Sequence, residues 1–294
     1  MQKEKLEKKN KKFKMRKLKN GFTSINNNFM KISIVILNYK SKRLVGNCIR
    51  QIRASKIEVP YEIIVVDNDS NDGIVQMMAE EFKGIKFILA TKNLGMGPGN
   101  NLGIKASEGE YVIILNPDIY VAEETIQRMY DYIKDKPEIG FLAPRLLNPD
   151  GSLQYTCYRW YKFLTPLYRR TVLGKIKSIQ KELDYFLMKD VDHEKIQEVD
   201  WCQGSCFLVP KRIWQQVGGF DERFFMYFED TDLCRRIRNK DFKVIYHGEI
   251  TAIHMHMKMS QGGIFQIFSN KLTRQHIHSW LKYSLKHRKS LFSI

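Results

Sequence analysis

Two adjacent carboxylates, Glu229 and Asp230, directly follow the aromatic stretch 224–228. Together with Asp232 they stand at the start of a predicted helix over 230–239. N-capping and the helix dipole explain one acid at a helix start better than three. The aromatic neighbours would remove water from a carboxylate and raise its pKa toward the working range of a general base. We therefore interpret the pair as a candidate for abstracting a proton from a substrate.

A second group of acids, Asp67, Asp69 and Asp72, lies in the polar turn 67–73. Asp and Asn are common in turns because they tolerate the backbone angles found there. Three acids at the end of one strand are still more than a turn requires. A carboxylate here can accept hydrogen bonds from a nucleobase imide N–H or a ribose hydroxyl. The turn is therefore a candidate nucleotide site.

A third acidic position, Asp118, stands two residues after Asn116, beyond the apolar run 110–115. The intervening proline stops the strand and aims Asp118 away from the sheet; an ordinary Asx turn is the alternative interpretation. A solitary exposed carboxylate suits a divalent cation that is held mainly by a diphosphate. His254 and His256 are either surface residues or ligands that complete such a site.

Short β-branched runs alternate with apolar residues at helical spacing through the first half of the chain. The predicted strands are 32–37, 62–66, 85–90 and 110–115, and the predicted helices are 44–52, 74–82 and 123–135. This alternation predicts an α/β fold with a doubly wound, mostly parallel sheet. In such sheets ligands bind at the carboxyl ends of the strands, which is where these polar groups lie.

The glycine- and asparagine-rich segment 93–104 is either a flexible loop or a place where the backbone approaches a ligand closely. It lacks the G-x-G-x-x-G spacing of dinucleotide-binding proteins, and the chain has no P-loop motif. The second half is less regular: 205–210 and 242–247 are predicted strands, and 152–198 is a predicted variable lobe. Without an internal repeat or a clear linker, we expect one compact domain.

The composition is that of a globular protein, with 294 residues of which 43% are hydrophobic and 28% charged. No apolar run approaches the ~18 residues needed to span a bilayer, and the N-terminus has no apolar signal core. Integral membrane and secreted proteins are therefore disfavoured. The five cysteines are odd in number and irregularly spaced, which favours reduced cytosolic thiols over a disulfide scaffold.

The net charge of +17 is concentrated at the two ends. Residues 1–31 contain 11 basic and 2 acidic residues, and after Glu249 there are 7 basic residues and no acid. The N-terminal end is predicted to be a solvated tail, with a membrane-surface segment or a native start at Met30 as alternatives. Residues 264–294 have the pattern of a basic amphipathic helix, which would either lie on anionic lipid or pack on the domain.

Six motifs in the expected order resemble glycosyltransferase family 2, most closely its rhamnosyltransferase-like enzymes of bacterial cell-surface polysaccharide synthesis. They lie at 35–39, 65–73, 93–104, 115–119, 201–209 and 218–238, within a resemblance that covers about residues 31–256. The resemblance implies a GT-A fold with a nucleotide-binding first half and an acceptor-binding second half, assigned here to residues 31–260. A tail, 1–30, and a basic C-terminal extension, 261–294, flank it.

The resemblance also implies inverting transfer from a nucleotide-diphosphate sugar. The residues that match its donor-binding positions are Asn38, Tyr39, Asp67, Asp69, Asn93, Gly95, Gly99, Asn100, Asn116 and Arg235. Among them, Tyr39 would offer the base a stacking face, Asp67 would bind the pyrimidine edge, and Arg235 would lie near the diphosphate. The first expected donor is dTDP-rhamnose, and a UDP-linked hexose is the next.

By the same resemblance, Asp230 would be the catalytic base, with Glu229 beside it. Asp118 takes the place of the last acid of the family's D-x-D motif, and His254 would complete a site for Mg²⁺ or Mn²⁺. Asn116 replaces the first acid of that motif, which leaves the metal requirement open. The residues that would shape the acceptor side are Trp201, Gly204 and Ser205.

The implied acceptor is a lipid-linked saccharide or a growing polysaccharide. The basic ends would then hold the enzyme in the cytoplasm, on the anionic inner face of the plasma membrane. A glycoside hydrolase also uses paired carboxylates but needs no nucleotide-binding half. The nearly neutral centre of the chain argues against nucleic acid as a partner. An inactive transferase-like scaffold is disfavoured by the presence of Asp67, Asp118 and Asp230.

Overall fold

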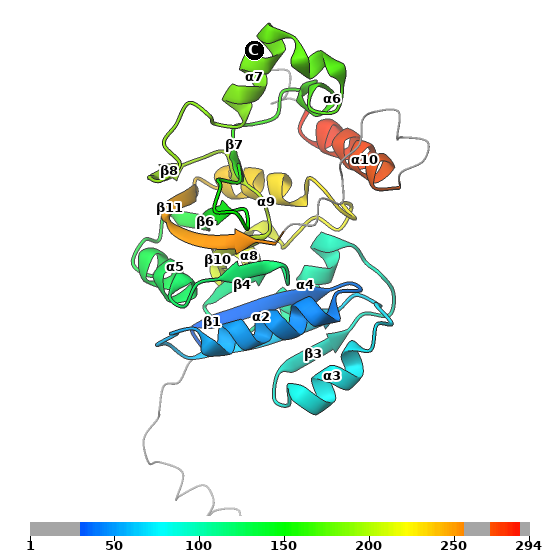
Figure 1. Ribbon diagram of the computed structural model, residues 1–294, viewed down its shortest axis with the longest axis vertical. Coiled ribbons are helices and arrows are strands. Elements are labelled where there is room, and N and C mark those ends of the chain that lie inside the picture. Colours follow the sequence, from blue (N-terminus) through cyan, green and yellow to red (C-terminus); the bar gives the residue numbers. More distant parts are fainter. Residues whose placement is uncertain (1–29, 256–270, 289–294) are drawn as a thin grey trace, which may run out of the picture.

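The computed structural model describes residues 30–255 and 271–288 (Figure 1). The strands are β1 (Ile32–Asn38), β2 (Tyr61–Asp67), β3 (Lys86–Leu89), β4 (Tyr111–Leu115), β5 (Ile119–Val121), β6 (Ile139–Leu147), β7 (Cys157–Tyr158), β8 (Ile196–Glu198), β9 (Trp201–Cys202), β10 (Cys206–Pro210) and β11 (Lys243–His254). The helices are α2 (Lys42–Ala54), α3 (Ile74–Glu81), α4 (Met96–Ala106), α5 (Thr125–Ile133), α6 (Thr165–Tyr168), the 3₁₀ helix η1 (Val172–Lys175), α7 (Lys177–Phe186), α8 (Lys211–Val217), α9 (Glu229–Arg238) and α10 (Lys271–Lys286). The predicted N-terminal tail up to residue 29, and His256, lie outside the described residues.

A mixed sheet forms the centre of the described structure, in the order β3-β2-β1-β4-β10-β6-β11-β5, with β8 beside β11. β3, β2, β1 and β4 run parallel, as do β6 and β11, while β10 and β5 are antiparallel to their neighbours. The register places Asn38 beside Asp67 at the carboxyl ends of β1 and β2. The expected α/β fold with a mostly parallel sheet is confirmed.

The sheet is covered on both faces, because β1 is buried along its whole length and its side chains alternate between two cores. On one face, Ile34 and Ile36 belong to a core shared with α2, α3 and α5. On the other face, Val35 and Leu37 belong to a core shared with α4, α8 and α9. Burying such a side chain typically contributes ~1.5–3 kcal/mol. The two cores therefore hold in place the sheet edge from which the polar turns emerge.

Of the two alternatives for the glycine-rich segment 93–104, the flexible loop is wrong, because α4 occupies most of the segment. Gly99 and Gly103 face the sheet, where an added Cβ atom would come within 2.8 Å of Leu37 and 2.3 Å of Val35. Glycine weakens a helix intrinsically, but at these positions it lets the helix backbone lie directly on β1. Close packing, rather than helix propensity, therefore decides the structure of this segment.

The second half contains a two-stranded ribbon of β7 and β9, and α6 and α7 lie at the end of the molecule opposite α3 (Figure 1). α10 packs nearby: Tyr283 is fully buried, and Ser279 Oγ donates a hydrogen bond to Met226 O at 2.7 Å. Lys286 Nζ lies 2.6 Å from Asp232 at the start of α9. Of the two expected positions for this segment, the described part takes the one packed on the protein.

The five cysteines of the chain are free and buried. Burial raises the pKa of Cys48, Cys157 and Cys206 to about 12, so these thiols stay protonated at neutral pH. Within residues 30–255 and 271–288, no helix is both long enough and apolar enough to cross a membrane.

Candidate active site

The turn 67–73 is built around Asn38, the last residue of β1. Its Nδ2 donates hydrogen bonds to Asp67 Oδ1 and Ser70 Oγ, both at 2.8 Å, and its Oδ1 accepts one from the Ser41 backbone N–H at 3.1 Å. Asn38 has no exposed surface. This side chain, which matches a donor-binding position of the family, is buried, so its role is to hold the turn in place.

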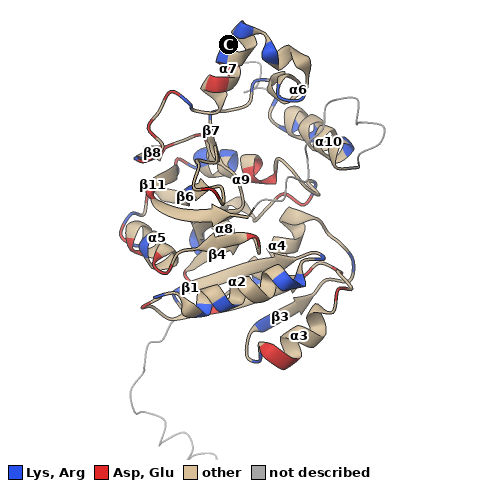
Figure 2. Ribbon diagram, viewed as in Figure 1, with Lys and Arg blue, Asp and Glu red and all other residues tan. Residues whose placement is uncertain are grey.

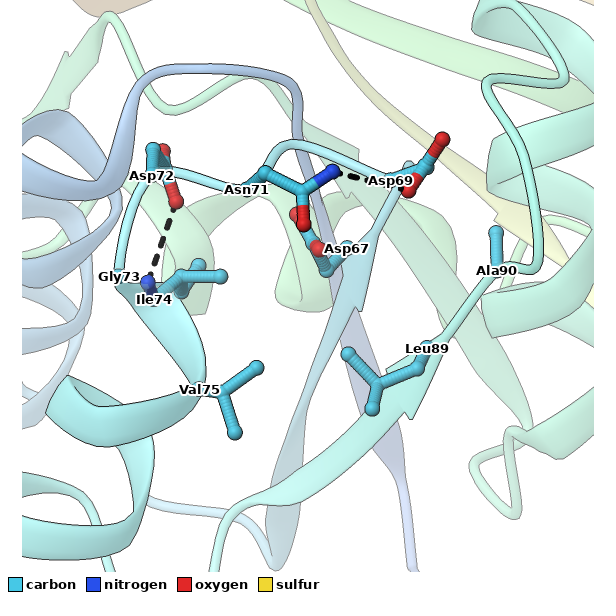
Figure 3. Close-up of a pocket in the computed structure, with 9 residues that line it drawn as sticks. All are labelled: Asp67, Asp69, Asn71, Asp72, Gly73, Ile74, Val75, Leu89 and Ala90. Carbon is cyan, nitrogen blue, oxygen red and sulfur yellow. Dashed lines mark hydrogen bonds between the residues drawn. The ribbon is translucent and has the colours of Figure 1, made fainter.

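A cavity of about 220 Å³ lies against this turn (Figure 3). It is lined by Asp67, Asp69, Asn71, Asp72, Gly73, Ile74, Val75, Leu89 and Ala90. The carboxylates provide hydrogen-bond acceptors, while Val75 and Leu89 provide apolar contact. Ligand sites commonly combine apolar walls with a few placed polar groups in this way. The cavity therefore has the chemistry expected for one edge and one face of a nucleobase.

Tyr39 extends beyond β1 next to the turn. It is 45% exposed, and Lys40 Nζ lies 5.4 Å from the centre of its ring. A partly exposed aromatic ring offers the stacking face that the sequence predicts, and the lysine adds positive charge beside it.

Asn68, which sequence analysis did not single out, joins the turn to the segment before α4. It is only 2% exposed. Its Nδ2 donates to Asn93 Oδ1 and Gly95 O, both at 3.0 Å, and its Oδ1 accepts from the Leu94 N–H at 2.9 Å. This one amide therefore brings two predicted donor-binding residues next to Asp67. The only sequence signal for it is its position between two aspartates of the turn.

Gly95 connects the two halves of the protein. Its φ angle is 93°, and an added Cβ atom would lie 2.1 Å from Phe225 O, so no larger residue fits there. The Met96 N–H donates to the same carbonyl at 2.7 Å.

Inside α4, Asn100 is 1% exposed, and its Oδ1 has no hydrogen-bond partner within the part of the chain that the structure describes. Gly99, by contrast, faces β1 and contributes to packing.

Asp230 is held by backbone N–H groups at the start of α9. The Gly204 N–H donates to its Oδ2 at 3.0 Å, and the Thr231 N–H donates to its Oδ1 at 2.7 Å. The two residues before the acid pair, Tyr227 and Phe228, have φ angles of 70° and 68°. Such a backbone costs about 1–3 kcal/mol per non-glycine residue and is typical of functional sites. The chain therefore gives up stability where it positions this carboxylate.

Burial raises the pKa of Asp230, against the lowering effect of the Gly204 and Thr231 N–H groups. Burial, together with the charge of Asp230, raises the pKa of Glu229 to about 8. Glu229 is 8% exposed, and its Oε2 has no hydrogen-bond partner among the described residues. Two neighbouring carboxylates, Glu229 buried and Asp230 half-buried, resist being charged together. The pair can therefore take up a proton near neutral pH, as a general base must.

His254, the last residue of β11, faces Asp118: its Nε2 lies 3.4 Å from Asp118 Oδ2. The pairing of β11 with β5 sets this position, with His254 opposite Ile119. Gln154 Oε1 lies 2.8 Å from His254 Nδ1 and so fixes the orientation of the imidazole ring. Sequence analysis missed Gln154, because nothing in its surrounding sequence links it to a histidine on a distant strand.

Asp118 and His254 fit a divalent cation that is held jointly with a diphosphate. Mg²⁺ is usually bound by one or two carboxylates together with substrate phosphates, and the side chain of Asp118 is 28% exposed. Over residues 30–255 and 271–288, no group of three or more His, Cys, Asp or Glu side chains is placed to hold a metal ion. A cation at Asp118 would therefore need further oxygen ligands from a bound molecule.

The predicted acceptor-side turn lies between Asn116 and Asp230. Ser205 O accepts the Asn116 N–H at 2.8 Å, and the next residue back, Gly204, donates its N–H to Asp230. An added Cβ atom on Gly204 would lie 3.1 Å from Asp230 Cβ, so the backbone approaches the acid closely. Backbone contacts thus join the end of β4 to the start of α9.

Trp201 and Arg235 lie in a buried aromatic cluster around β7 and β9. The Trp201 ring stacks on Tyr158 with ring centres 4.2 Å apart, and it is 4% exposed. Arg235 is 6% exposed, and its guanidinium carbon lies 4.2 Å from the centre of the Trp160 ring. The proximity of Arg235 to a diphosphate and the place of Trp201 on the acceptor side remain predictions.

Comparison with known proteins identifies the family. Residues 33–195 match the family described as glycosyl transferase family 2. The chain is 30% identical over 234 residues to the low-salt glycan biosynthesis hexosyltransferase Agl10 of Haloferax volcanii, covering 76% of this chain and 66% of that protein. It is also 30% identical over 208 residues to the N-acetylglucosaminyl-diphospho-decaprenol L-rhamnosyltransferase of Mycobacterium tuberculosis, covering 67% of each.

Among solved structures, the mannosyltransferase PcManGT from Pyrobaculum calidifontis, in complex with GDP-Man and Mn²⁺, matches with a TM-score of 0.57 at 16% identity. The match covers 87% of this chain and 64% of that one. At this identity the likeness shows the fold alone, and the fold is that of the GT-A glycosyltransferases. The chain spans about two thirds of the length of the proteins it matches here.

Proposed function

Because the chain belongs to glycosyl transferase family 2, we propose that it transfers a sugar from a nucleotide-diphosphate donor to a hydroxyl group, with inversion at the anomeric carbon. The observation that carries the proposal is Asp230, a carboxylate of raised pKa that two backbone N–H groups hold beside Glu229. Asp67 ends β2 and Asp118 follows β4, so both lie at the carboxyl ends of parallel strands, where such sheets commonly bind ligands, and this supports the proposal.

In the proposed reaction, Asp230 accepts the proton of the acceptor hydroxyl as the hydroxyl oxygen bonds to the anomeric carbon. The bond from that carbon to the diphosphate oxygen breaks on the opposite face, and its electron pair leaves with the nucleotide. General-base catalysis of this kind typically contributes ~10²–10⁴-fold. Asp118 and His254, together with the donor, would hold Mg²⁺ or Mn²⁺, and the ion would supply positive charge for the leaving diphosphate.

As donor we propose dTDP-rhamnose first and a UDP-linked hexose second. Relatives named for L-rhamnosyl and hexosyl transfer support this class of sugar. The carboxylate of Asp67 at the cavity and the exposed ring of Tyr39 suit the edge and face of a pyrimidine base. Asn116 stands where a second acid would otherwise add charge, so the donor itself would contribute much of the cation's ligation.

As acceptor we propose a lipid-linked saccharide or a growing polysaccharide. The name of the tuberculosis relative, which specifies a decaprenol-linked acceptor, supports this class. The proposed location is the cytoplasm, at the inner face of the plasma membrane. There the basic residues near the two ends would each contribute about 1 kcal/mol of attraction to an anionic surface.

Calorimetric titration with dTDP and with UDP, each with and without Mg²⁺, tests the proposal. We expect wild type to bind one nucleotide with micromolar affinity, Asp67→Ala to lose this binding, and Asp118→Ala to lose the part that depends on Mg²⁺. Asp150→Ala is the matched control, because Asp150 is an exposed turn residue whose carboxylate bonds to the neighbouring Ser152. Binding of neither nucleotide by wild type would contradict the proposal and favour an inactive scaffold.

A further inference from the structure

α6 and α7 lie at one end of the molecule (Figure 1), and this end, which includes η1 between them, exposes several apolar side chains. Val172 is 77% exposed, Leu173 40% and Ile176 49%. Because these three residues lie within five consecutive positions, they form one surface feature, here called the apolar tip.

The apolar tip belongs to a segment that has a packed core of its own. Gly174, in the middle of the tip, is buried, and an added Cβ atom there would lie 2.5 Å from Tyr168 O. In α7, Leu183 and Phe186 are buried, and Phe186 stacks on Tyr158 with ring centres 5.3 Å apart. The segment therefore has its own packed side, and the tip residues point away from it.

Positive charge surrounds the apolar tip. Residues 161–181 contain six Lys or Arg and no Asp or Glu, and Figure 2 shows basic segments at this end of the ribbon. Lys175 and Lys177 are exposed on either side of Ile176. The nearby ion pairs use other lysines, as in Lys162–Glu182. Within the described residues, the charges of Lys175 and Lys177 are thus left for an anionic partner.

We propose that the apolar tip inserts into an anionic lipid bilayer. Aliphatic side chains flanked by lysines enter the boundary between acyl chains and headgroups, while the ammonium groups meet lipid phosphates. Lys175 and Lys177, exposed beside the aliphatic side chains, match an extended anionic surface better than a protein partner of mixed charge. The inference deepens the proposed function, on which it rests for the lipid-linked acceptor, and assigns membrane contact to a surface outside the two basic ends.

Insertion of the tip would orient the proposed active site. The lobe that carries the tip contacts the segment before the acid pair, since the Tyr161 and Phe228 ring centres are 5.0 Å apart. The nucleotide-side elements around α3 lie at the opposite end of the molecule (Figure 1). A bilayer at the tip would therefore be nearer to Glu229 and Asp230 than to the turn 67–73. A lipid-linked acceptor requires this arrangement, because its hydroxyl group must reach the proposed base.

Sedimentation with lipid vesicles tests the tip, using the full chain and phosphatidylcholine vesicles with and without phosphatidylglycerol. We expect V172S/L173S to bind the anionic vesicles about tenfold more weakly than wild type, because two inserted aliphatic side chains are lost. The matched control is Ile196→Ser on β8, an aliphatic residue 38% exposed that lies outside both the tip and the two basic ends. This control should bind within about twofold of wild type. Wild-type binding by V172S/L173S, or an equal loss in the control, would overturn the proposal.

A labelling experiment locates the insertion directly. Since the native cysteines are buried, a polarity-sensitive thiol dye will attach selectively to Val172→Cys. We expect its emission to shift to the blue on anionic vesicles, whereas the same dye on Val75→Cys, 52% exposed on α3, keeps its emission. An unshifted dye at position 172 would refute insertion. Self-association that V172S/L173S abolishes, without a dye shift, would instead identify a second copy of the chain as the occupant.

The nucleotide titration keeps this proposal separate from the proposed function. V172S/L173S should bind nucleotide as wild type does, which also shows that the variant is folded. If wild type binds vesicles through the tip but binds neither nucleotide, the transferase proposal fails and the membrane surface stands. If it binds nucleotide but the tip variants keep full vesicle binding, the membrane surface fails alone.

Discussion

The turn 67–73 and the start of α9 both present acids, yet their surroundings differ. The carboxylate of Asp67 accepts hydrogen bonds from the side chain of Asn38 and the backbone N–H of Ser70. The Oε2 of Glu229, in contrast, has no hydrogen-bond partner among the described residues. A hydrogen-bonded turn keeps one shape and suits binding, whereas a buried carboxyl short of partners changes protonation readily and suits proton transfer.

Within α9 the same contrast separates neighbouring acids. Asp232 has no exposed surface and contacts Arg236, Lys286 and His287 at 2.7, 2.6 and 2.8 Å. Burial alone would raise the pKa of Asp232, but the His287 hydrogen bond and the two cations outweigh it and hold that pKa below its usual range. The pKa of Glu229, three residues earlier, is raised to about 8. The charged partners of Asp232, which are Arg236 on α9, Lys286 at the end of α10 and His287 directly after it, make the difference.

The largest expected effect is on catalysis at the start of α9. Asp230→Asn keeps the size of the side chain but cannot accept the proton, so we expect kcat to fall ~10²–10⁴-fold. Nucleotide affinity should stay within about twofold, because the contacts of the turn 67–73 are untouched. Steady-state kinetics and calorimetry on the same preparation measure the two quantities. A variant with wild-type kcat would remove Asp230 from the role of base.

The pH dependence sharpens this prediction. A base acts only when ionised, so kcat/KM should fall as the pH falls through the pKa of Asp230. Burial raises that pKa, which places the rising limb above the usual Asp value of about 3.9. A rising limb at or below that value would show that another group limits the rate.

The second effect is on the free energy of unfolding and concerns the turn 67–73. Asn38→Ala leaves buried groups of Asp67 and Ser70 without their partner, so we expect the free energy of unfolding to drop by about 2–3 kcal/mol. Asn47→Ala is the matched control, because Asn47 is exposed on α2 and should change stability by no more than about 0.5 kcal/mol. Urea denaturation measures both variants. Similar losses in the two would mean that the turn is not specially dependent on Asn38.

The smallest effect concerns the stability cost of burying the Glu229 carboxyl group. Between about pH 4.5 and 8, the folded state holds a proton on Glu229 that the unfolded chain has released, so stability falls as the pH rises. The slope is at most about 1.4 kcal/mol per pH unit. Glu229→Gln removes this pH dependence. We expect the free energy of unfolding of the variant to exceed that of wild type by at least about 1 kcal/mol at pH 8 and to be nearly equal to it at pH 5.

Asp232→Asn should behave in the opposite sense. A depressed pKa stabilises the folded state above the unfolded pKa, and this contribution is lost as the pH falls through the folded pKa. The variant should therefore be less stable than wild type at neutral pH and approach it in acid. Thermal melting makes the comparison, from about pH 5 to 8 for Glu229→Gln and from about pH 2 to 6 for Asp232→Asn, because the folded pKa of Asp232 lies below its unfolded value of about 3.9. Parallel curves for Glu229→Gln and wild type would contradict the raised pKa.

Much of the fold was predictable from the chain because its signals are local. The runs 32–37 and 62–66 are β-branched and lie within buried strands, and the polar residues that follow them stand at the carboxyl edge as expected. The segment 93–104 was not predictable, because its glycines favour a loop locally and form a helix only against Leu37 and Val35. Propensity is a weak guide where packing dominates.

The candidate site was predictable to the extent that strand ends converge. The pairs Asn38–Asp67 and Asp118–His254 are joined as the topology implies. Asn68 and Gln154 were missed, because each acts through an amide whose partners depend on three-dimensional proximity. A polar side chain inside a turn or a lobe carries no local mark of such a role.

The sequence alone determined which acids stand at strand ends and at the start of α9, because apolar runs and turn residues mark these places locally. Only the tertiary structure decided which acids have hydrogen-bond partners and which have a raised pKa. Gly204 reaches Asp230 from 26 residues away, and His287 reaches Asp232 from 55. Desolvation and hydrogen bonding shift a pKa through whatever packs around the group. Those neighbours are assembled by folding.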